Sequence, residues 1–159
     1  MKKLLVLAAF IVASVAVNAA AVKWTAANVY GSDLTTKLAV GSEVSLYGAL
    51  VTEGVAGEFT KLDSFTLTTA GAVTKTTGDI FTAEDVYNFY FTFEDNGKMF
   101  TSATKESVTI KAVGDTAVAF GNQATATRNA SNWAAVPEPT SGLLLLLGMA
   151  GLALKRKRA

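Results

Sequence analysis

Carboxylates are the main candidates for chemistry in this chain. The 159 residues include no histidine and no cysteine. This composition excludes Ser-His-Asp and Cys-His nucleophiles, thiolate metal sites and imidazole ligands. The adjacent acidic pairs are Glu84-Asp85 and Glu94-Asp95. Neighbouring residues of an extended strand point to opposite faces, so neither pair forms the two-carboxylate site of a glycosidase by itself. We therefore predict a protein that is not an enzyme and uses no cofactor.

One short segment has some features of a calcium loop. It reads Asp95-Asn96-Gly97, but the alternating acidic ligands and the closing glutamate of such a loop are missing. Asn-Gly is also the preferred pair for a two-residue hairpin turn. The segment therefore predicts a turn, and we expect no metal site in the chain.

Aromatic side chains offer a second kind of binding site, because an exposed ring can stack on a sugar. The candidates are Tyr30, Tyr47, Tyr90, Trp24 and Trp133. Aromatic residues more often belong to a core or cover its edge. A carbohydrate-binding, lectin-like domain is therefore the alternative interpretation of the central part of the chain.

The first 21 residues contain the three parts of a secretory signal peptide. Lys2 and Lys3 form a basic start, and residues 4–17 form an apolar run that predicts a helix. Ala19 or Ala21 then ends a cleavage site of the A-x-A kind. These small residues favour a cleaved signal over an uncleaved anchor, so residues 22–135 are predicted to be one exported domain.

The predicted domain is mildly acidic. Residues 22–135 contain eight basic and 12 acidic side chains, a net charge of −4. This balance argues against nucleic acid as a partner. Because the chain has no cysteine, no disulfide can stabilise the exported domain. Its stability must come from packing.

The composition and patterning of the domain predict strands and turns. Thr, Val, Ala and Gly are abundant, and no proline occurs before residue 137. We predict strands at residues 24–30, 43–51, 59–68, 73–77, 108–112 and 118–120, with a hairpin at 87–102. Residues 121–135 are predicted to grade into a linker.

The hairpin is the clearest of these elements. Aromatic residues occupy every second position from Tyr87 to Phe93 and predict a strand with one aromatic face. A two-residue turn at Asn96-Gly97 would place Phe93 opposite Phe100. Together the short strands predict an all-β fold, a small antiparallel β-sandwich or jelly roll.

The last 24 residues divide into three parts. Two prolines at residues 136–139 hold the chain extended, as a protease requires. The apolar run at about 140–154 predicts a single transmembrane helix that is barely long enough for a ~30 Å hydrocarbon core. A basic cluster follows and stays on the cytoplasmic side; it consists of Lys155, Arg156, Lys157 and Arg158. A permanently anchored single-pass protein is one interpretation of this tail.

The ordered combination of a short motif, an apolar helix and a basic cluster resembles the C-terminal sorting signal of PEP-CTERM proteins. The motif consists of Val136, Pro137, Glu138 and Pro139. The resemblance covers residues 136–159 only and implies processing near the motif by an exosortase, a membrane-embedded transpeptidase.

The resemblance also implies a localisation. The protein would be exported, anchored in the membrane by its C-terminal helix in transit, and then placed at the cell surface or outside the cell. Exopolysaccharide of a biofilm matrix is a further partner that the resemblance implies. We therefore predict a non-catalytic structural or adhesive surface module.

Overall fold

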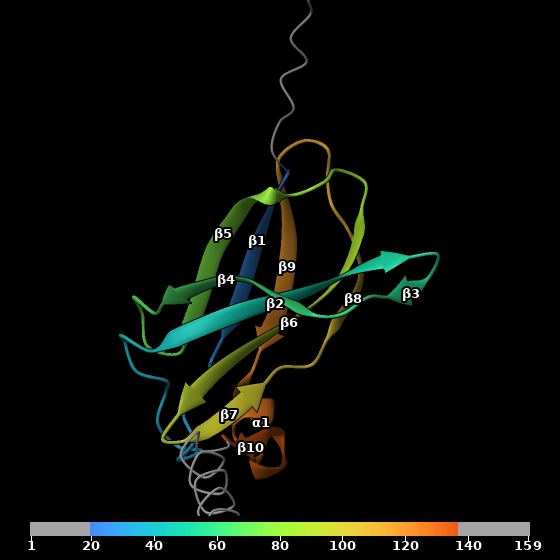
Figure 1. Cartoon of the computed structure of the whole chain (residues 1–159). Coiled ribbons are helices and arrows are strands. Elements are labelled where there is room, and N and C mark those ends of the chain that lie inside the picture. The colour runs from blue at the N-terminus through green and yellow to red at the C-terminus, as the bar shows by residue number, and fades with distance from the viewer. Residues whose placement is uncertain (1–19, 137–159) are drawn as a thin grey trace, which may run out of the picture.

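The computed structural model describes residues 20–136 of the chain (Figure 1). The predicted signal-peptide helix and transmembrane helix lie outside the described residues. The described elements are β1 (Ala20–Ala27), β2 (Glu43–Thr52), β3 (Val55–Ala56), β4 (Thr60–Thr66), β5 (Ala72–Phe81), β6 (Val86–Asp95), β7 (Lys98–Thr101), β8 (Lys105–Thr109), β9 (Asp115–Asn122), α1 (Ala124–Thr127), the 3-10 turn η1 (Ala130–Asn132) and β10 (Trp133–Ala135).

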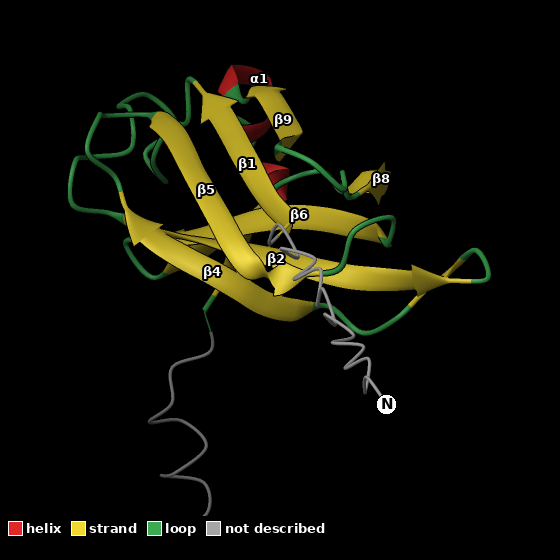
Figure 2. Ribbon diagram, turned by 90° about the horizontal axis from the view of Figure 1, so that it is seen from above, coloured by secondary structure: helices red, strands yellow, loops and turns green. Residues whose placement is uncertain are grey.

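The strands form two sheets. The smaller has three strands in the order β5-β1-β9. The larger has seven strands in the order β10-β7-β6-β2-β3, with β4 paired to β2 and β8 paired to β6. Figure 2 shows the smaller sheet lying across one face of the larger one. The all-β prediction is confirmed, but the prediction of purely antiparallel pairing was wrong for β1 and β9, which run parallel.

The core lies between the two sheets and is rich in aromatic residues. The smaller sheet contributes Trp24 and Val118, and β6 contributes the alternating aromatics that the sequence pattern predicts. Across the interface, Phe91 packs edge-on against Phe120 with ring centroids 4.9 Å apart. Edge-to-face packing of this kind adds to the stabilisation from burial. Two sheet faces therefore close over one core without a disulfide.

The hairpin of β6 and β7 has the predicted turn. Asn96 and Gly97 have φ values of 49° and 71°, and two successive positive values define a type I′ turn. The turn places Phe93 directly opposite Phe100, with ring centroids 5.0 Å apart. Both predictions are confirmed, because turn chemistry sets hairpin register locally.

Residues 121–135 are not a linker, so that prediction was wrong. They contain the end of β9, α1, η1 and β10. Trp133 packs its ring against Phe93 and Phe100, with centroids 5.3 and 5.5 Å away. Its indole N–H donates to the carbonyl oxygen of Thr127 at 2.9 Å. One aromatic anchor thus holds a segment whose Asn, Ala and Thr composition suggests a loop.

Candidate functional site

An open groove runs along the face of the larger sheet that points away from the core. Residues of β2 and β6 alternate between the core and this face. The groove has a volume of about 300 Å³. Its lining residues are mostly polar, and they are Glu43, Ser45, Tyr47, Lys61, Thr92, Phe93, Glu94 and Met99. Such a surface can donate and accept hydrogen bonds along its length.

Stacked aromatic rings lie at one end of this groove. Tyr47 and Tyr90 are opposite each other on β2 and β6, with ring centroids 5.1 Å apart and planes 8° from parallel. Phe59 packs on Tyr90 with centroids 4.7 Å apart. Burial, with a smaller contribution from Tyr47, raises the pKa of Tyr90 above its ordinary value. Both tyrosines remain partly exposed.

The other predicted sugar-stacking candidates lie elsewhere. Trp24 is fully buried in the core, and Trp133, the first residue of β10, packs against the edge of the core. The Arg128 guanidinium lies over the ring of Tyr30, 3.9 Å from its centroid. Of the five aromatic candidates, only Tyr47 and Tyr90 are brought together by the fold.

A charged pair lies in the same groove, next to Tyr47. Lys61 Nζ lies 3.1 Å from Glu43 Oε1, and the hydrogen bond from Lys61 is the main cause that lowers the pKa of Glu43. A bulge in β4 places this lysine: Asp63 pairs with Leu46, but Lys61 rather than Leu62 pairs with Tyr47. The extra residue switches Lys61 to the outer face, while Asp63 faces the smaller sheet.

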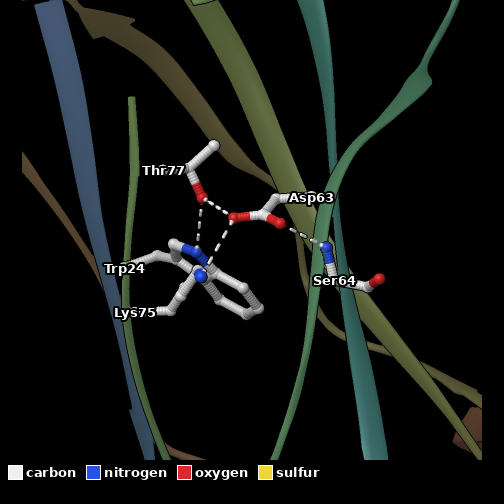
Figure 3. A network of polar contacts seen from close by, with 5 residues as sticks. All are labelled: Trp24, Asp63, Ser64, Lys75 and Thr77. Carbon is white, nitrogen blue, oxygen red and sulfur yellow. Dashed lines mark hydrogen bonds and ion pairs between the residues drawn. The ribbon is translucent and has the colours of Figure 1, made fainter. Parts of the chain in front are cut away.

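Asp63 takes part in a polar network that joins the two sheets at one edge, which we call the clasp (Figure 3). Its Oδ2 accepts a hydrogen bond from Thr77 Oγ1 at 2.6 Å and lies 3.9 Å from Lys75 Nζ. Its Oδ1 accepts from the Ser64 N–H at 2.7 Å. Trp24 Nε1 donates to Thr77 Oγ1 at 3.2 Å. The contacts of the clasp hold the two sheets together. Within residues 20–136, every buried side-chain polar atom has a hydrogen-bond partner, so the clasp leaves no such atom free to bind a ligand.

The two acidic pairs that the sequence singles out lie in different settings. Glu84 sits in a turn with a positive φ of 69°. Glu94 lines the groove, whereas Asp95 Oδ2 accepts hydrogen bonds from the N–H and the hydroxyl of Ser32, each at 2.7 Å. Asp95 therefore fastens a loop to the β6–β7 turn. Among the described residues, no group of three or more acidic side chains could hold a metal ion.

The predicted signal-cleavage residues lie at the start of β1. Ala19 is outside the described residues, but Ala21 pairs with Asp115 of β9. Ala20 pairs with Phe81 of β5 and is 4% exposed. Cleavage after Ala21 would remove Ala20 and Ala21, which pair with β5 and β9.

The first sorting residue, Val136, is the last residue that the structure describes. The Val136 N–H donates to the Gly97 carbonyl oxygen at 3.1 Å. Pro137, Glu138, Pro139 and the basic cluster lie outside the described residues. No helix within residues 20–136 has the length and apolarity to cross a membrane.

Residues 20–136 therefore form a β-rich domain, and the sorting motif begins at the end of this described range. Residues 135–158 match the family model of the PEP-CTERM protein-sorting motif, which confirms the resemblance of the tail. The motif implies an exported protein that an exosortase processes. No curated protein and no solved structure matched the chain.

Proposed function

We propose that this protein is a non-catalytic structural or adhesive module of the bacterial cell surface or extracellular matrix. Its tail holds it in the membrane during export, and an exosortase then processes it near Pro137-Glu138-Pro139. The observation that carries the proposal is the match of residues 135–158 to the sorting motif, directly after a folded domain. The structural roles of Asp63 and Asp95 support a non-catalytic domain.

Intact-mass analysis of the protein released from cells tests this function. We expect a chain that begins at Ala20 or Val22 and ends within residues 137–140, because the signal peptide and the tail are both removed. The matched control replaces the motif by Pro137→Ala, Glu138→Ala and Pro139→Ala. This variant should stay in the membrane fraction with its basic cluster attached. A wild-type chain that retains Lys155 to Arg158 would instead establish a permanent anchor.

A second candidate function is carbohydrate binding in the outer groove. The observation that favours it is the stacked pair of Tyr47 and Tyr90 beside polar side chains. A pyranose ring has an apolar face that stacks on an aromatic ring and hydroxyls that form hydrogen bonds. Glu43, Lys61 and Thr92 supply donors and acceptors at suitable positions along the groove.

Affinity electrophoresis in gels that contain dextran or alginate, as neutral and acidic polysaccharides, tests this candidate. We expect Tyr47→Ala to weaken retardation about tenfold, since loss of one aromatic contact costs about 1.4 kcal/mol. Tyr30→Ala is the matched control, because this tyrosine pairs with Arg128 away from the groove. Equal retardation of the wild-type protein and Tyr47→Ala, or none by either polysaccharide, would exclude the groove as a site for these sugars.

A further inference from the structure

The sorting motif and the folded domain share residues. The match to the motif begins at residue 135, while β10 extends to Ala135 and pairs with β7. In that pairing Ala135 lies opposite Lys98. The next residue, Val136, donates its N–H to Gly97 at 3.1 Å. Val136, the one residue between β10 and Pro137, is therefore itself paired with the β6–β7 turn.

This overlap matters for any enzyme that binds the motif. Proteases commonly bind their substrates as an added strand, through main-chain hydrogen bonds. An enzyme that acts near Pro137-Glu138-Pro139 would also contact the residues just before the motif. In the folded domain, the backbone of Ala135 and Val136 already pairs with β7 and its turn. The same backbone groups cannot serve both partners at once.

β10 has the features of a segment that can open alone. It has three residues and forms the outer edge of the larger sheet, beside β7 and α1 at one end of the molecule (Figure 1). Ala134 and Ala135 are exposed. Its main anchor is Trp133, which packs on Phe93 and Phe100. Segments with few buried contacts open at a small fraction of the global unfolding free energy.

We propose that β10 is a latch that must leave β7 before the exosortase can bind the motif. This inference rests on the proposed function, that the tail is processed. Only the open fraction of molecules is competent for binding, so the processing rate follows that fraction. Trp133 sets the fraction through its packing and its hydrogen bond to Thr127. Re-pairing after processing restores the complete sheet.

A reversible cross-link tests the latch in the full-length chain. The bond from Val136 to Gly97 makes Ala135 and Lys98 a non-hydrogen-bonded pair. The Cα atoms of such pairs are about 4.5 Å apart, within the range of a disulfide. The chain has no cysteine, so Lys98→Cys with Ala135→Cys introduces a single possible intramolecular bridge. Processing is followed by gel shift and mass, in membranes that contain the exosortase.

We expect the oxidised double variant to be processed at least tenfold more slowly than wild type, and dithiothreitol to restore its rate. The single variant Ala135→Cys should be processed at a similar rate with and without reductant. Trp133→Ala, which weakens the latch, should be processed several-fold faster than wild type. An oxidised variant processed as fast as its reduced form would overturn the latch. A wild-type chain that is not processed at all would instead reject the proposed function.

Discussion

Replacing Trp24 with alanine is expected to lower the free energy of unfolding of the exported domain by about 3–5 kcal/mol. The side chain is 0% exposed and fills the space between the two sheets. It packs edge-on against Phe65, with centroids 5.6 Å apart, and donates to Thr77 in the clasp. The substitution leaves a cavity and removes this donor. Since small domains are stable by only about 5–15 kcal/mol, much of the stability would be lost.

Urea unfolding of the processed protein, followed by circular dichroism, measures this effect. Trp24→Phe is the matched control, because it keeps one aromatic ring in the core but removes the N–H donor. The phenylalanine variant should lose about 1–2 kcal/mol, the cost of one lost hydrogen bond with a modest change in packing. Equal midpoints for the two variants would show that cavity formation at this position costs little.

Gly71→Ala is expected to destabilise the domain by about 2–4 kcal/mol, for two separate reasons. Gly71 has a φ of +65°, a conformation that disfavours other residues. A Cβ built at this position would also lie 2.8 Å from the Val29 carbonyl oxygen and 3.1 Å from Lys37 Cβ. The Val29 backbone cannot easily move away from the added Cβ, because the Val29 N–H donates a hydrogen bond to the Gly71 carbonyl oxygen at 3.0 Å.

Gly114→Ala separates the two contributions. Gly114 has a similar φ of +74°, but nothing lies within 4 Å of its built Cβ. This variant should lose only the conformational part, about 1 kcal/mol. Thermal unfolding of both purified variants gives the comparison. If Gly71→Ala and Gly114→Ala shift the midpoint equally, the contact with Val29 contributes nothing.

The hairpin of β6 and β7 could be predicted because its signals are local. Period-two aromatics determine which side of β6 faces the core, and Asn96-Gly97 determines the turn. Neither signal depends on distant residues. The position of Trp133 is a different case, since its packing against Phe93 depends on where α1 and η1 direct the chain. The composition of residues 121–135 carries no signal for that path.

The candidate groove could be predicted only in part. The alternation in β6 indicates that Tyr90 faces away from the phenylalanines, and it does lie on the outer face. Its neighbours Tyr47 and Phe59 come from β2 and from the loop before β4. The bulge in β4 turns Lys61 outward and Asp63 inward. The hydrophobic pattern of the sequence does not indicate this bulge. One signal could have revealed the clasp. Asp63 lies two residues before Phe65 in β4, so the period-two pattern places an acidic side chain on the same inward side as an aromatic one.

The sequence by itself was enough to identify the C-terminal sorting motif of this protein. A sorting motif is recognised as a linear order of residues, so composition and order carry its information without any fold. Only the tertiary structure showed that the sorting motif overlaps the end of β10. It also decided which strand pairs in parallel with β1 and which side chains meet in the groove. These features depend on pairing between residues far apart in the chain. Period-two patterning specifies the side on which a residue lies, but burial of the whole aromatic core selects its partner.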